Sequence, residues 1–178
     1  MLHIDAFFTL LGPGAAGHLS LTAGVHLRVA VELHIRALWA SFCLDEEILW
    51  RHLEADSGAP SFKTVLDLLE AVASKPELGR AEQNTLQTSV ALLSPLAGDA
   101  WGVLCSHVHG GLRVFLASWN SFKGHAPFEA QDLLTMAQLG VRLVAHTGVF
   151  VAQVLSDQEG YDTAANVLVE WTSTAKSL

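Results

Sequence analysis

Apolar residues recur at helical spacing along most of this chain, and runs with strand-like alternation are few. Within residues 21–55 they form two stripes. One stripe includes Leu27 and Ile35, and the other includes Leu33 and Ala37, which predicts a helix buried on most of its girth. Turn-forming residues separate the later apolar stretches. The pattern predicts helices over residues 21–55, 61–74, 80–93, 100–120, 128–155 and 162–174.

Several ends of these helices carry local signals. Ser61 is suited to cap the second helix and Asp99 the fourth, because short polar side chains accept hydrogen bonds from the first free backbone N–H groups. We interpret Gln158-Glu159-Gly160 as a break before the last helix. Residues 1–20 read as a short helix with a glycine-rich connector, and residues 21–178 as one all-α, single-domain bundle of five to seven helices.

Composition adds an expectation about partners. The 178 residues are 51% hydrophobic and 16% charged, against about 25% charged for an average soluble domain. Such a chain has apolar surface left over after its core is filled, so we expect a homo-oligomer, most simply a dimer. The net charge of −8 argues against a broad nucleic-acid surface or a polybasic membrane anchor.

A cytoplasmic location fits the remaining features. Cys43 and Cys105 lie in apolar helical contexts and read as free thiols. The N-terminal apolar run lacks a preceding basic residue, so it makes a poor signal peptide. The most apolar long segment, residues 139–155, looks too short and too polar to span a membrane, since it carries Arg142 and His146. This last pair reads as a buried polar pair with a core histidine.

A first candidate site lies on the first long helix. Glu32 and Arg36 are four residues apart, in the orientation that favours an ion pair within a helix. Apolar residues flank them, including Trp39 on the same face. A charge in such a setting must be paired or neutral. The pair is either a buried structural ion pair or one wall of a preorganised site.

The second candidate lies in the stretch Cys105-Ser106-His107-Val108-His109-Gly110-Gly111. Two glycines cost an apolar helix about 1 kcal/mol each relative to alanine, which suggests a close backbone approach or a site. His109 is either a core histidine or a catalytic group, with Ser106 or Cys105 as a nucleophile beside it. Cys105 and His109 share a helical face but supply only two metal ligands, whereas structural zinc takes four. We predict no metal and no cofactor.

These residues resemble a family of small bacterial all-helical proteins that has no assigned activity. The family carries a Glu-x3-Arg-x2-Trp helix and a later Trp-x4-Ser-x2-His-x-Gly segment. Here the first motif is Glu32, Arg36 and Trp39, and the similarity covers roughly residues 28–155. The second motif runs from Trp101 through Ser106 and His109 to Gly111. The resemblance implies an all-helical fold and a site at these positions.

The chain is also loosely similar to HEPN domains, the higher eukaryotes and prokaryotes nucleotide-binding domains. These are helical up-down bundles, often dimeric, in phage-defence and toxin–antitoxin systems, and many are metal-independent ribonucleases. Their motif places an Arg five to seven residues before the catalytic His, but here those positions hold Gly102, Val103 and Leu104. Arg28 and His34 match this spacing, but chance alone is expected to produce such a match, so it carries little weight. A HEPN-like site would therefore need Arg36 as its cation.

Two functional hypotheses follow. In the first, the chain is a HEPN-like bacterial protein with an RNA or nucleotide ligand. If it is an enzyme, it is a metal-independent ribonuclease, in which His109 acts as general acid/base and Arg36 stabilises phosphate charge, with Glu32 and Ser106 completing the site. In the second, the chain is a non-catalytic, oligomeric interaction protein, and Glu32, Arg36 and His109 form a structural network.

Overall fold

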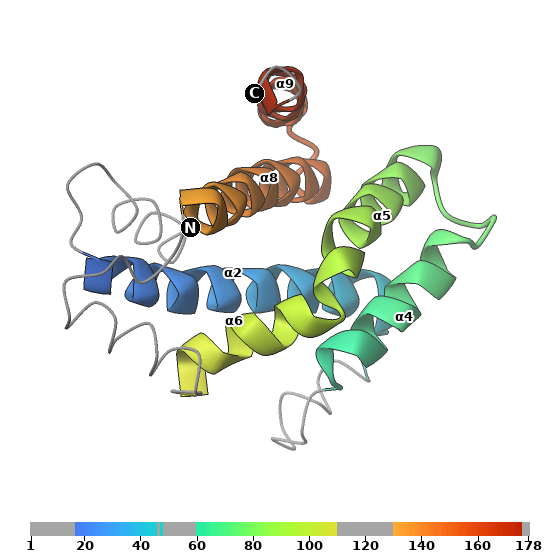
Figure 1. Cartoon of the computed structure of the whole chain (residues 1–178). Coiled ribbons are helices and arrows are strands. Elements are labelled where there is room, and N and C mark those ends of the chain that lie inside the picture. The colour runs from blue at the N-terminus through green and yellow to red at the C-terminus, as the bar shows by residue number, and fades with distance from the viewer. Residues whose placement is uncertain (1–16, 46, 48–59, 110–129, 176–178) are drawn as a thin grey trace. The chain divides into compact units, whose positions relative to one another are not determined.

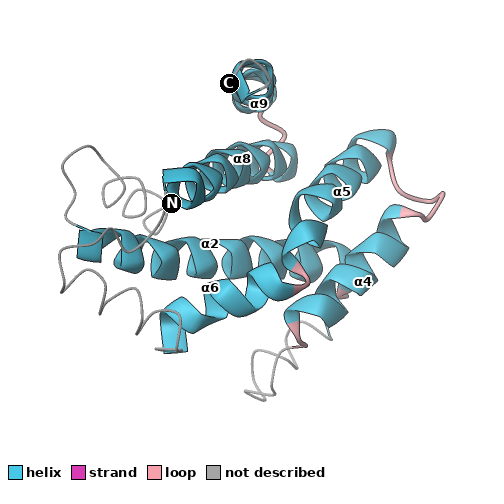
Figure 2. Ribbon diagram, in the orientation of Figure 1, coloured by secondary structure: helices cyan, strands magenta, loops and turns pink. Residues whose placement is uncertain are grey.

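The computed structural model describes residues 17–45, 47, 60–109 and 130–175 (Figure 1). That part of the chain is helical and contains no strand (Figure 2), so the predicted all-α class is confirmed. The elements are α2 (Gly17–Cys43), α4 (Phe62–Ala73), α5 (Arg80–Leu93), the 3-10 helix η1 (Ser94–Leu96), α6 (Asp99–His109), α8 (Ala130–Val154) and α9 (Gln158–Ala175).

The chain divides into two compact units. One comprises residues 1–31 and 99–178, and the other comprises residues 32–98. Helix α2 contributes to both units. The division at residue 20 stays a prediction, and residues 17–20 belong to α2.

One face of α2 is buried and the opposite face is not. Leu27 and Ile35 belong to the core, as the first apolar stripe predicts. The second stripe was expected to be buried as well, and this is wrong for Leu33 and Ala37, which are both exposed. Apolar side chains at helical spacing show which face avoids charge, but not whether another element covers it.

Helix α2 also ends earlier than the apolar pattern predicts. It stops at Cys43, and neither Leu44 nor Asp45 is helical. Glu47 is helical again. An Asp followed by acidic residues is a typical helix N-terminus, where side-chain oxygens and negative charge meet free N–H groups. The continuous apolar stripe concealed this signal.

Helices α4 and α5 pack against each other within the second unit. The Ser61 hydroxyl accepts a hydrogen bond from the Thr64 backbone N–H at 3.2 Å, which confirms the predicted cap. The side chain of Gln83 donates to the Ala73 carbonyl at 3.1 Å and so joins the start of α5 to the end of α4. The buried side chains of the two helices are Phe62, Val65, Leu66, Leu69, Ala73, Thr85, Leu86, Ser89, Val90 and Leu93.

Helices α8 and α9 pack against each other in the first unit, and three residues join them. Ser156 has a positive φ of 54°, and the Asp157 N–H returns to the Ala152 carbonyl at 2.8 Å, which together close the end of α8. The Asp157 side chain then accepts from the Gly160 N–H at 3.0 Å. Residues 158–160 are therefore the first turn of α9, and the predicted break there is wrong because Asp157 caps the helix.

Helices α8 and α9 approach each other closely at Gly148. A β-carbon placed there would lie 3.0 Å from the β-carbon of Ala164. A methyl group at that distance is closer than almost all ordinary contacts, so the Ala164 methyl group would have to give way by a few tenths of an ångström. Gly148 therefore allows the two backbones to approach.

The apolar segment of α8 is longer than the sequence pattern predicts. The stretch Gln131–Val154 is long and apolar enough to cross a membrane by length and composition, because the helix begins well before residue 139. A third of its apolar window is buried inside the molecule, and core helices of soluble proteins pass the same test. Arg142 and His146 lie within it. We treat α8 as weak evidence for a membrane span.

Candidate functional site

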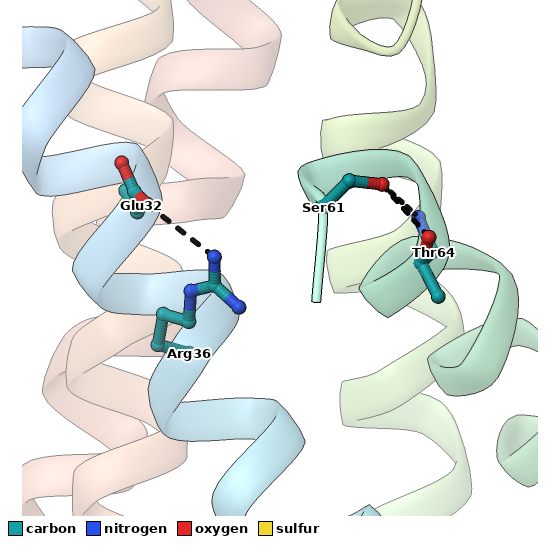
Figure 3. Close-up of polar contacts among 4 residues, drawn as sticks. All are labelled: Glu32, Arg36, Ser61 and Thr64. Atoms are coloured by element: carbon teal, nitrogen blue, oxygen red, sulfur yellow. Dashed lines mark hydrogen bonds and ion pairs between the residues drawn. The ribbon is translucent and has the colours of Figure 1, made fainter. Parts of the chain in front are cut away.

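The Glu32–Arg36 pair predicted from spacing is present. Arg36 Nη2 lies 3.5 Å from Glu32 Oε1, one turn away on α2 (Figure 3). The Arg36 guanidinium also lies 6.0 Å from the centre of the Trp39 ring, at the outer limit of a cation–π contact. Trp39 itself is buried. The three motif residues on this helix therefore form one local cluster.

The cluster is less buried than the sequence suggests. The side chains of Arg36 and Glu32 are 24% and 27% exposed. Solvent screens such a pair, and an i,i+4 ion pair on a helix contributes about 0.3–0.5 kcal/mol, whereas removing one partner of a fully buried pair costs about 3–5 kcal/mol. A variant lacking this pair should therefore fold, which makes it usable in functional tests.

A second cation contact was missed by the sequence analysis. The Arg28 guanidinium lies 5.1 Å from the centre of the Trp101 ring, so α2 contacts α6 within the first unit. Trp101 belongs to one of the motifs, whereas Arg28 appeared only as a chance spacing match to His34. His34 is buried. No sequence signal links two residues so far apart, because the contact depends on how two helices pack.

The other two site residues lie near the end of α6. Ser106 and His109 are helical in the backbone, and their side chains fall outside the described part of the structure. Gly110 and Gly111 also lie outside the described residues. The convergence of Arg36 and His109 in one pocket stays a prediction, since the two residues belong to different compact units.

The cysteines offer little chemistry. Both Cys43 and Cys105 are free thiols and half-buried. Burial raises the pKa of the Cys43 thiol, while the positive charge of Lys75 opposes this effect. A raised pKa keeps the thiol protonated and weakly nucleophilic. Across residues 17–45, 47, 60–109 and 130–175, no group of three or more His, Cys, Asp or Glu residues is arranged to hold a metal ion.

His146 on α8 is buried, as predicted for a core histidine. Burial lowers its pKa, because an imidazolium loses its hydration inside the protein, and the charge of Arg142 one turn earlier lowers it further. The Arg142 Nε is itself buried and has no hydrogen-bond partner among the described residues. His146 and Arg142 therefore place two buried polar groups on a helix that is otherwise mostly apolar.

We expect His146 to make the stability of the protein depend on pH. The unfolded histidine binds a proton below a pH of about 6.5, whereas the folded protein resists protonation there. The free energy of unfolding should therefore fall as the pH drops through and below this value, and level off above it. Urea unfolding at a series of pH values will measure this slope, with His146→Gln as the comparison. Equal slopes for both proteins between pH values of about 5 and 7 would contradict the assignment.

Comparison with known proteins adds no relative to this picture. No family model, no curated protein and no solved structure matches the chain. The two resemblances drawn from the motifs therefore stay predictions.

Proposed function

We propose that this chain is a non-catalytic helical protein that binds protein chains, in the first instance its own copy. The observation that supports this most is the number of large apolar side chains at its surface, on four different helices. Each exposed apolar group favours association, because contact with another chain removes it from water. They are Leu33 on α2, Leu68 on α4, Leu134, Val151 and Val154 on α8, Leu155 just after α8, and Val167 and Val169 on α9.

In this proposal the Glu32–Arg36 pair is structural. Each partner offsets the charge of the other on one helix at 3.5 Å, and both side chains keep some contact with solvent. We also propose a cytoplasmic location, which suits a protein whose Cys43 and Cys105 are both free. No metal or cofactor is part of the proposal.

The alternative is the HEPN-like protein acting on RNA or a nucleotide, in a bacterial defence or toxin–antitoxin setting. One contact favours it. The Arg28 guanidinium over Trp101 brings a positive charge against α6, the helix that also holds Ser106 and His109. In that case His109 would serve as general acid/base, and an arginine from α2 would stabilise phosphate charge.

Two measurements on the purified full chain separate these functions. Sedimentation equilibrium over a roughly hundredfold range of concentration should show a mass that rises with concentration. RNA incubated with wild type and with His109→Ala should stay intact in both. Cleavage by wild type that is lost in His109→Ala, with equal thermal melts for the two proteins, would overturn the non-catalytic function. A monomer at every concentration would overturn self-association.

A further inference from the structure

The outward face of α2 within residues 32–98 has an unusual composition. Leu33, Ala37 and Ser41 follow one another at intervals of one turn, and all three are exposed. Leu33 is 57% exposed. The water-facing side of a helix is usually charged or strongly polar, but these three positions carry no charge. We call Leu33, Ala37 and Ser41 the α2 stripe.

The charges beside the stripe are self-complementary. Glu32, Arg36 and Ala40 run along one edge of it at the same spacing, and all are partly buried. The edge therefore has one negative and one positive group, one turn apart. When a second copy of the same edge runs in the opposite direction, its arginine faces Glu32 of the first copy and its glutamate faces Arg36 of the first copy. The net charge of −8 works against an anionic partner or an anionic membrane.

Symmetry determines which arrangement uses this complementarity. When two copies of α2 pack antiparallel about a two-fold axis, the same edge of both helices lies on the same side of the contact. With Leu33 opposite Ala37 of the second copy, Glu32 is offset by two residues, or about 3 Å along the axis, from Arg36 of that copy. A parallel pair would put the two charged edges on opposite sides. Only the antiparallel arrangement brings them together.

We propose that the α2 stripe is the surface through which two copies of this chain associate, antiparallel and two-fold symmetric. This rests on the proposed function and names the surface that performs it. The small side chains of Ala37 and Ser41 allow the helix axes to approach to about 8–10 Å. A single helix pair is a small interface, so the dimer should be of micromolar strength and depend on concentration.

The first test is a charge placed on the stripe. Leu33→Asp should weaken dimerisation at least about tenfold by sedimentation equilibrium, because the aspartate would be desolvated against an apolar neighbour. A matched pair of substitutions provides the control: Ala37→Asp lies on the stripe and should weaken the dimer in the same way, whereas Ala91→Asp makes that change at an exposed residue of α5 outside the stripe. Ala91→Asp should dimerise like wild type. Arg36→Glu should also weaken the dimer, and the exchanged pair Glu32→Arg with Arg36→Glu should restore it.

The second test distinguishes the two directions of packing. In a Cys43→Ser, Cys105→Ser background with an unchanged thermal melt, Leu33→Cys and Ala37→Cys are made in separate, differently tagged chains. An antiparallel contact predicts that a mild oxidant links the two variants to each other, since their β-carbons face across the axis. A parallel contact would link Leu33→Cys chains to themselves as well as Ala37→Cys chains to themselves, and would overturn the proposal.

The outcomes separate this inference from the proposed function. A protein that stays monomeric at every concentration overturns both. A dimer that Leu33→Asp and Ala37→Asp both leave intact overturns the α2 stripe and retains self-association through another surface. Loss of the dimer in both of these variants but not in Ala91→Asp, together with the mixed disulfide, supports the proposal.

Discussion

Replacing Leu69 with alanine should lower the free energy of unfolding by about 3 kcal/mol, the middle of the range for removing a fully buried leucine side chain. Leu69 lies on the inner face of α4 with no exposed surface, and α4 packs against α5. The truncation loses the transfer energy of the side chain and leaves a cavity that the two helices can fill only in part. Urea unfolding followed by circular dichroism will measure the loss.

The neighbouring residue provides the control. Leu68 is on the same helix, one position earlier, and is 42% exposed. Leu68→Ala makes the same chemical change with similar helix propensity, so it should cost under about 1 kcal/mol. If the two variants lose similar amounts of unfolding free energy, Leu69 does not lie on the buried face of α4.

The second large effect is expected at the contact between α8 and α9. Gly148→Val should destabilise the protein by about 2 kcal/mol, because a β-carbon there would lie 3.0 Å from that of Ala164 and the branched side chain extends further. Valine is no worse than glycine as a helix former. Any loss of stability therefore measures the crowding between the helices. Thermal and urea unfolding of the variant will give its size.

Gly102 on α6 allows the same substitution without the crowding. A β-carbon there meets no atom within 4 Å. Gly102→Val should leave stability unchanged or raise it slightly. In addition, Ala164→Gly should cost less stability in the Gly148→Val background than in wild type, since it removes the opposing methyl group there while its helix-propensity cost is the same in both. A Gly148→Val protein as stable as wild type, or an equal cost of Ala164→Gly in both backgrounds, would be evidence against this close contact.

The elements that the sequence predicted well are those whose signals are local. Ser61 gave the start of α4, and the apolar spacing gave α5 to the residue. The start of α9 was missed because Gly160 looked like a helix breaker, whereas it lies in a first turn that Asp157 caps. The end of α2 was missed because one apolar stripe continues past Asp45. The α9 error came from weighing glycine content above the capping Asp157, and the α2 error came from weighing apolar spacing above the acidic sequence of residues 45–47.

The candidate site also has features that the sequence predicted and features that it did not. The Glu32–Arg36 pair was predictable since its geometry is that of a single helix. Its partial exposure was not, and neither was the contact of Arg28 with Trp101, because burial and contacts between helices depend on packing in three dimensions. The exposure of Leu33 was unforeseeable for the same reason, and it became the most informative surface feature of the molecule.

The short connection between α8 and α9 restricts how the length of this chain can vary. Each added residue turns a helix by about 100°, so one insertion between Asp157 and Ala164 would rotate Ala164 away from Gly148 and bring a different side chain to that narrow point. Related chains should therefore conserve the number of residues between Gly148 and Ala164 more strictly than their identities. Insertions and deletions among them are expected beyond the end of α9 rather than inside this hairpin.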